Sequence, residues 1–173
     1  MKVEINKLTK KFNNIEAVKN ITFLIEKNKT LGLLGPNGCG KTTSIGMMLG
    51  LIKPTSGSIF IDGKDINKSQ KNTLLSFINF ASPYVELPKR LTVKQNLEVY
   101  GRLYGVKNLE DRIKEISEDL NLGLYLNKKT GELSSGQKNR VSLAKSLINK
   151  PKLLFLDEPT ASLDPDIGDF VRN

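Results

Sequence analysis

The stretch from Leu31 to Thr43, which reads LGLLGPNGCGKTT, constrains the fold of this chain more than any other segment. A short apolar run leads into a glycine-rich turn that fits the pattern G-x-x-x-x-G-K-[ST] without a gap. Glycine adopts backbone angles that a side chain forbids, so such a turn can direct its N–H groups inward around phosphates. We therefore expect a buried strand over residues 31–34, then a phosphate-binding loop, then a helix that begins near Lys41 and continues to about Leu51.

The residues of this loop have distinct expected roles, and the helix N-terminus adds partial positive charge beside them. The side chain of Lys41 is expected to reach the β- and γ-phosphates, and the hydroxyl of Thr42 to bind Mg²⁺. A glycine-rich turn that binds nothing is the alternative, and the apolar segments on both sides argue against it. The residues assigned to the phosphate site are Gly35, Pro36, Asn37, Gly38, Cys39, Gly40, Lys41, Thr42 and Thr43.

The composition is that of one ordinary domain, with 173 residues, of which 38% are hydrophobic, and a single cysteine that excludes an internal disulfide framework. No stretch approaches the roughly 20 apolar residues that span a membrane, and the N-terminus lacks the apolar region of a signal peptide. A cytoplasmic protein is the default expectation. The net charge is +9, but the lysines are scattered without interleaved aromatic residues, so we interpret them as solvated surface rather than a nucleic-acid interface.

The first sixty residues favour strands. Residues 1–8 alternate between apolar and polar, residues 21–25 read ITFLI, and residues 58–62 read SIFID and end at an Asp-Gly turn signal. Phe12 lies near the end of the first expected strand. A lone phenylalanine at such a position usually belongs to a core, and it gains a functional meaning only if an adenine ring lies nearby.

The pattern changes in the middle of the chain. Residues 74–81 are apolar and typical of a strand, and a proline-bounded loop follows. Thr92 with Gln95 forms a capping-box pattern before a run at helical spacing, and residues 110–120 repeat that spacing. Residues 133–137, LSSGQ, open a third expected helix with Ser134 as a good N-cap residue. The sequence therefore predicts a helical segment over roughly 92–150 that interrupts the strand-rich part.

Two carboxylates follow the last apolar run. Residues 152–156, KLLFL, lead directly into Asp157 and Glu158. Carboxylates at the end of a buried strand are costly unless they meet a cation, and Mg²⁺ with a reacting water supplies a reason for them. Asp157 suits the metal shell, and Glu158 suits the orientation or deprotonation of water. The alternative is an acidic turn without catalytic meaning.

These motifs, in this order, resemble the nucleotide-binding domain of ATP-binding cassette (ABC) proteins, most of which are transporters. Phe12 matches the aromatic residue that stacks on adenine in this family, and Val18 matches the small apolar residue that follows it. The resemblance covers the whole chain, with residues 35–43 similar to the Walker A motif, LSSGQ at 133–137 to the signature motif, LLFLDEP at 153–159 to Walker B, and ASLD at 161–164 to the D-loop.

The resemblance implies an α/β fold of the P-loop NTPase type, with a RecA-like parallel sheet flanked by helices, an antiparallel β subdomain and an inserted helical subdomain. Residues 1–81 and 151–173 would form the nucleotide-binding core, and residues 82–150 the helical subdomain. The family also has a switch histidine on a strand beyond the D-loop, whereas this chain contains no histidine and ends at Asn173. We therefore expect a C-terminally truncated cassette that binds ATP weakly and hydrolyses it slowly or not at all.

The function implied by the resemblance is that of an ATPase subunit of a transporter, with ATP and Mg²⁺ as ligands. Lys41 and Glu158 would be catalytic, and Thr42 and Asp157 would bind the metal. ATP would lie between Walker A of one cassette and the signature of a second, in a head-to-tail homo- or heterodimer. A membrane-spanning permease would hold the chain at the inner face of the cell membrane, with no direct nucleic-acid partner. The partner-facing residues would be Ser134, Ser135, Gly136 and Gln137 of the signature and Asp164 of the D-loop.

The missing histidine and a missing glutamine leave alternatives open. Ser82 follows the strand where the family has a glutamine that contacts Mg²⁺ and the attacking water. Ser135 stands in place of the usual glycine within the otherwise matching signature. A cytoplasmic ABC ATPase that acts on DNA or ribosomes is one alternative, although the helices here are too short for the coiled coils of chromosome-associated members. A non-catalytic, nucleotide-responsive module is another, which the missing glutamine and histidine favour and the intact Asp157-Glu158 pair opposes.

Overall fold

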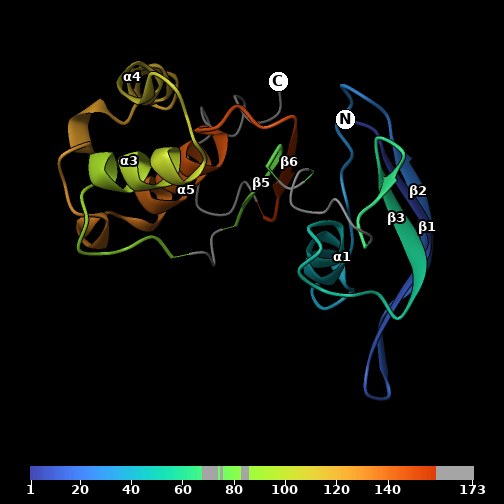
Figure 1. Cartoon of the computed structure of the whole chain (residues 1–173). Helices are drawn as coiled ribbons and strands as arrows, with labels where there is room; N and C mark the ends of the chain where they lie inside the picture. The colour runs from blue at the N-terminus through green and yellow to red at the C-terminus, as the bar shows by residue number, and fades with distance from the viewer. Residues whose placement is uncertain (68–73, 75, 83–85, 159–173) are drawn as a thin grey trace. The chain divides into compact units, whose positions relative to one another are not determined.

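The computed structural model describes residues 1–67, 74, 76–82 and 86–158, and the chain divides into two compact units (Figure 1). The first unit comprises residues 1–78 and the second residues 79–173. The first unit is built on an antiparallel sheet, and the second on three helices beside a short parallel sheet. The mixed α/β class expected from the sequence is confirmed.

The sheet of the first unit has the strand order β2-β1-β3-β4. Val3 and Ile5 lie opposite Ile25 and Phe23 on one side and opposite Ile61 and Ile59 on the other. Val3, Ile5, Ile59 and Ile61 are fully buried, because alternate residues of a strand point to the same face. The strands predicted around residues 1–8, 21–25 and 58–62 are therefore confirmed. Their bounds are β1 Val3–Phe12, β2 Ile15–Ile25, β3 Ser56–Ile61 and β4 Lys64–Asp65.

Helix α1, Lys41–Met48, begins where the loop pattern predicts. Its buried face carries Ile45, Met47 and Met48. The helix ends three residues earlier than expected, because Gly50 adopts a left-handed conformation (φ 66°) and its N–H turns back to the carbonyl of Met47 at 3.0 Å.

The strand predicted over residues 31–34 is wrong. These residues form no strand within the described chain, and the side chain of Leu34 is 96% exposed. An extended segment becomes a strand only when a neighbour pairs with its N–H and C=O groups, and none of the described strands pairs with this run. An apolar run therefore shows that a segment is suited to burial, but it does not show whether another strand will pair with it.

The second unit contains the short parallel sheet and the three predicted helices. Strand β5, Ile78–Ala81, which starts at the boundary of the units, pairs with β6, Leu153–Leu156. The helices are α3 Val93–Leu103, α4 Leu109–Asp119 and α5 Ser135–Leu147, with short 3-10 turns at Gly123–Tyr125 and Thr130–Glu132. Capping boxes start α3 and α5. Within the described residues, no helix has the length and apolar character needed to cross a membrane.

The three helices enclose one apolar core at the spacing that the sequence predicts. Val93 and Leu97 of α3, Ile113 and Ile116 of α4, and Val141 of α5 are buried within it. The helical run predicted after the Thr92–Gln95 capping box contributes Val93 and Leu97 to this core, whereas Leu103, where α3 ends, is 73% exposed.

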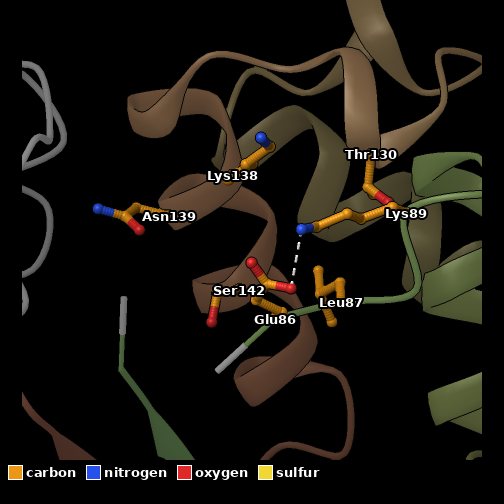
Figure 2. A pocket seen from close by; sticks show the side chains of 7 residues that line it. All are labelled: Glu86, Leu87, Lys89, Thr130, Lys138, Asn139 and Ser142. Carbon is orange, nitrogen blue, oxygen red and sulfur yellow. Dashed lines mark ion pairs between the residues drawn. The ribbon is translucent and has the colours of Figure 1, made fainter. Parts of the chain in front are cut away.

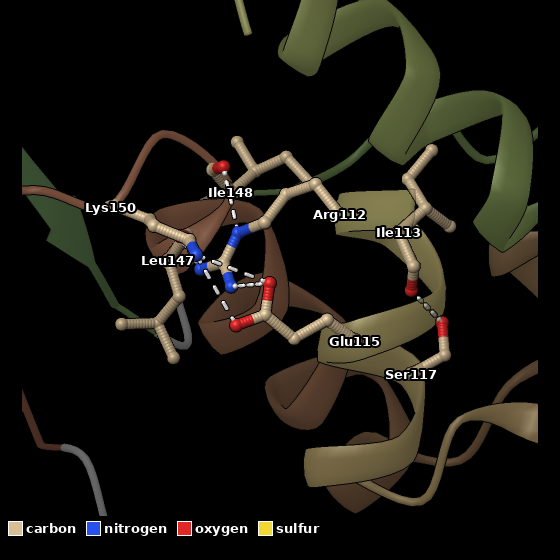
Figure 3. A network of polar contacts seen from close by, with 7 residues as sticks. All are labelled: Arg112, Ile113, Glu115, Ser117, Leu147, Ile148 and Lys150. Carbon is tan, nitrogen blue, oxygen red and sulfur yellow. Dashed lines mark hydrogen bonds and ion pairs between the residues drawn. The ribbon is translucent and has the colours of Figure 1, made fainter. Parts of the chain in front are cut away.

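Arg112 of α4 fixes the C-terminal end of α5 (Figure 3). Its guanidinium donates to the carbonyls of Leu147 at 2.6 Å and Ile148 at 3.2 Å, and it pairs with Glu115 at 2.8 Å. The last carbonyls of a helix lack helical partners, so a cation there satisfies them and also opposes the negative end of the helix dipole. The hydrogen bond from Arg112, joined by Lys150 at 3.3 Å, lowers the pKa of Glu115.

Candidate nucleotide-binding site

The side chain of Lys41 folds back over the glycine-rich loop. Its ammonium group donates to the carbonyls of Gly35 at 2.7 Å and Pro36 at 3.0 Å, and lies 4.0 Å from the sulfur of Cys39. The lysine therefore closes the loop on itself, with its positive charge held beside the backbone at the N-terminus of α1.

Two glycines give the loop its shape. Gly38 and Gly40 have φ angles of 82° and 95°, in the left-handed region that favours glycine. A Cβ on Gly40 would collide with the carbonyl oxygen of Ala17 and lie 2.9 Å from a methyl of Val18. The carbonyl of Gly40 also accepts from the N–H and the hydroxyl of Ser44 at 2.8 and 2.9 Å. The loop is thus fixed between β2 and α1.

The residues assigned to adenine lie on the same hairpin. Val18 is buried, lies opposite Lys10 in the ladder of β1 and β2, and faces the position of a Gly40 side chain. Phe12 is 47% exposed at the end of β1, with the Lys10 ammonium 4.7 Å from its ring centroid. Phe12 is therefore not a core residue, and its ring is accessible to a planar ligand.

The acidic strand end lies in the second unit. Asp157 follows β6, is 4% exposed, and donates its N–H to the carbonyl of Ala81 at 2.9 Å. Glu158 is exposed and has a φ angle of 50°, which is uncommon for a residue with a side chain. The strand end thus directs one carboxylate into the unit and leaves the next one open to solvent.

The signature segment starts α5 with a complete capping box. The Ser134 hydroxyl accepts from the N–H of Gln137 at 3.3 Å, and the Gln137 side chain accepts from the N–H of Ser134 at 3.1 Å. Ser135 and Gly136 occupy the first turn. The sequence analysis identified Ser134 as the cap but missed the reciprocal role of Gln137, although the same S/T-x-x-Q spacing was recognised at Thr92.

The predicted site residues lie in two separate units of the chain. The phosphate loop, Phe12 and Val18 belong to the first unit, whereas Asp157, Glu158 and the signature belong to the second. The convergence of Lys41 and Asp157 on one ligand therefore stays a prediction. Asp164, and with it the predicted D-loop, lies outside the described residues.

The donor chemistry fits a magnesium ion shared with phosphates. Among the described residues, no three His, Cys, Asp or Glu side chains gather as they would around an ion held by protein alone. Mg²⁺ is usually bound through one or two carboxylates together with phosphate oxygens and water. Asp157 supplies one buried carboxylate of this kind in the second unit, and Thr42 supplies one hydroxyl in the first, so their use of one ion stays a prediction.

A cavity in the second unit is not part of this site (Figure 2). Its volume is about 90 Å³. An ion pair between Glu86 and Lys89, at 3.0 Å, lies at its wall. The lining residues are Glu86, Leu87, Lys89, Thr130, Lys138, Asn139 and Ser142, none of which the motifs select.

Comparisons with known proteins agree with this geometry. Residues 18–161 match the family model described as ABC transporter. The chain is 38% identical over 165 residues to the probable multidrug ABC transporter ATP-binding protein YbhF of Escherichia coli K12, covering 94% of this chain and 28% of that protein. It is 35% identical over 160 residues to the ABC transporter ATP-binding protein NatA of Bacillus subtilis 168, and the match covers 91% of this chain and 65% of that protein.

Solved structures show the same fold. A putative ABC transporter ATP-binding protein from Pyrococcus furiosus superposes with a TM-score of 0.85 at 32% identity, covering 99% of this chain and 82% of that one. The ATP-binding cassette MJ0796, in a dimeric post-hydrolysis state bound to ADP and Pi, superposes with a TM-score of 0.85 at 30% identity. The match covers 96% of this chain and 78% of that one.

The fold and the glycine-rich loop define a P-loop NTPase of the cassette type. The chain belongs to the ABC transporter family, and it corresponds to the ATP-binding cassette of that family. It spans between about a quarter and two thirds of the length of the curated relatives YbhF and NatA. The relatives are named as transporter proteins, so the alternative of an ABC ATPase acting on DNA or ribosomes is not favoured.

Proposed function

We propose that the chain is the ATP-binding and ATP-hydrolysing cassette of an ABC transporter, and that these 173 residues by themselves bind ATP but turn it over slowly or not at all. The observation that carries this proposal is the preformed loop, in which the Lys41 ammonium rests on the carbonyls of Gly35 and Pro36. Hydrogen bonds from an ammonium group to charged phosphate oxygens are stronger than those to neutral carbonyls. A triphosphate would therefore draw the Lys41 ammonium away from these carbonyls and toward its own oxygens.

The hairpin of β1 and β2 supplies the base-binding part of the proposed site. The exposed ring of Phe12 is free of the core and can stack on adenine, and buried Val18 gives the loop a firm apolar support. Both lie in the same unit as the loop, so this half of the site needs no rearrangement between units.

The second half of the proposed site is the acidic strand end. Thr42 and Asp157 are the residues that would hold Mg²⁺, and the ion, when bound, neutralises charge that develops on the phosphates during transfer. Glu158, exposed at the end of β6, would orient the attacking water and accept its proton. This step requires Asp157 and Glu158 to meet the phosphates held by Lys41.

A second cassette is the proposed partner for catalysis, in a head-to-tail dimer. The dimeric state of MJ0796, a relative by structure, supports this arrangement. The first turn of α5, with Ser134, Ser135 and Gly136, would face the γ-phosphate bound by the partner, joined by Gln137 and by Asp164 of the D-loop. Residues 82–150 would contact a membrane-spanning permease at the inner face of the membrane, and residues 1–81 and 151–173 would form the catalytic core.

The direct test is binding of a fluorescent ATP analogue to the purified chain. We expect Lys41→Ala to weaken binding by at least tenfold, because it removes the cation that meets the phosphates. Lys114→Ala, on the exposed side of α4, is the matched control and should bind as the unchanged protein does. Failure of the unchanged protein to bind the analogue at all would refute the proposal, and Glu158→Gln should preserve binding while it abolishes any turnover.

A further inference from the structure

The ammonium group of Lys10, near the end of β1, is held by two contacts within the first unit. It donates to the carbonyl of Lys53 at 2.9 Å, and it lies 4.7 Å from the centroid of the Phe12 ring. The connection that carries Lys53 is attached to β1, because the N–H of Thr55 donates to the carbonyl of Thr9 at 2.9 Å. The ammonium group over the ring is therefore anchored to backbone that is joined to the sheet.

The Phe12 ring meets this cation while about half of the residue remains open to solvent. Phe12 is the last residue of β1 and is 47% exposed. A cation over the face of an aromatic ring is attracted by the negative charge of the π-electrons. Because one ammonium group can lie over only one face of a ring, its contact with Phe12 leaves the opposite face for a planar ligand.

The cation favours stacking on that opposite face for two reasons. The faces of aromatic rings are negative, so two rings that stack repel each other where their faces coincide. A positive charge behind the Phe12 ring draws electron density away from the other face and lowers this repulsion. The contact with Lys10 also restricts an exposed side chain, so less rotamer freedom is lost when a ligand stacks on it. Both effects act through Phe12, without contact between Lys10 and the ligand.

We propose that Lys10 is a positioning residue for base recognition, whose ammonium group holds one face of Phe12 while the purine of the nucleotide stacks on the other. The inference rests on the proposed function, because it needs a nucleotide base at Phe12. It adds a residue that lies outside the phosphate-loop, signature and acidic-strand motifs. It also assigns this lysine to the affinity for the base rather than to the affinity for the phosphates.

The test separates binding of the base from binding of the phosphates. ATP and inorganic tripolyphosphate each displace a fluorescent ATP analogue from the purified chain, and the ratio of their two affinities is the gain due to the nucleoside. We expect Lys10→Met to lower this gain about two- to fivefold, the range for a cation–π contact at an exposed site. Lys10→Arg retains a cation that can lie over the ring and should restore the gain.

Lys11→Met is the matched control, because it removes the same charge from the neighbouring position. The Lys11 side chain is 53% exposed and pairs with Glu16 at 3.8 Å. We expect this variant to leave the gain due to the nucleoside unchanged. Any small loss of affinity for tripolyphosphate should be the same in Lys10→Met and Lys11→Met, since both variants remove one positive charge.

A double-mutant cycle with Phe12→Leu shows whether Lys10 acts through the ring. Once the ring is absent, Lys10→Met should cause no further loss of the gain, because coupled residues are not additive. The inference is overturned by an unchanged gain in Lys10→Met, by an equal loss for ATP and tripolyphosphate, or by a further loss in the Phe12→Leu background. Failure of the unchanged protein to bind either ATP or the analogue would instead contradict the proposed function itself.

Discussion

Helices α1 and α5 both carry a family motif at their N-terminus, but their ends are stabilised in opposite ways. Glycine starts α1 at Gly40 and ends it at Gly50, so neither position offers a side chain to the unpaired backbone groups. Side chains satisfy both ends of α5, with the Ser134–Gln137 capping box at its start and Arg112 at its last carbonyls. The start of α5 is therefore capped by side chains of the helix itself, whereas the start of α1 has no side-chain cap.

The difference matches the roles that we propose for the two helices. The proposed phosphate site needs N–H groups that no N-cap side chain has taken, and Gly40, the N-cap of α1 at φ 95°, makes no side-chain cap hydrogen bond. The signature needs a rigid start for α5 that presents small residues to a partner. In its cap, the N–H of Gln137 donates to the Ser134 hydroxyl at 3.3 Å, and in α3 the N–H of Gln95 donates to the Thr92 hydroxyl at 3.1 Å.

The strongest test of this comparison replaces Gly40 with alanine. A Cβ would meet the carbonyl of Ala17 and a methyl of Val18, and the left-handed angle adds its own strain. Together these effects should destabilise the first unit by about 2–5 kcal/mol and abolish binding of the ATP analogue. Denaturant unfolding and analogue titration measure both. Gly123→Ala is the matched control, because no atom lies within 4 Å of its added Cβ.

The next test removes the cation at the far end of α5. Arg112→Met keeps much of the aliphatic stem but leaves the carbonyls of Leu147 and Ile148 without their charged donor. Because the Arg112 side chain is only 11% exposed, we expect a loss of about 1–3 kcal/mol in urea unfolding. Lys150→Met, at a side chain that is 66% exposed, should change stability by less than about 0.5 kcal/mol. Equal effects of the two variants would show that Arg112 is not a cap.

A third test separates the structural and functional roles of the signature cap. Ser134→Ala should cost about 1 kcal/mol, and Thr92→Ala should cost the same at the start of α3. Ser134→Asp preserves an N-cap oxygen but places a negative charge where the γ-phosphate of a partner is proposed to lie. We expect it to retain stability and to lose ATP-dependent dimerisation in sedimentation, measured in the Glu158→Gln background. If Ser134→Asp dimerises to the same extent as the protein that retains Ser134, the proposed role of the signature at the partner's γ-phosphate is contradicted.

The same contrast explains what could be predicted from the sequence. Loop glycines, capping boxes and helical spacing are local signals, so the start of α1 at Lys41 and the starts of α3 and α5 were predicted correctly. Residues 31–34 failed as a strand, because strand formation depends on a partner that is distant in sequence. The carbonyl contacts of Arg112 were missed for the same reason, since nothing near Arg112 in the sequence identifies the end of α5.

The smallest expected effect concerns pH and the network at the end of α5. The hydrogen bond from Arg112 lowers the pKa of Glu115, so the charged carboxylate is favoured in the folded chain. A lowered pKa contributes stability at neutral pH that is lost as the pH falls below the ordinary glutamate value of 4.5 and through the folded value. Urea midpoints should therefore fall slightly more on acidification in the unchanged protein than in Glu115→Gln. Because Glu115 is solvated, the difference should be small and should shrink further in high salt, and identical acid profiles would show that this ion pair contributes nothing.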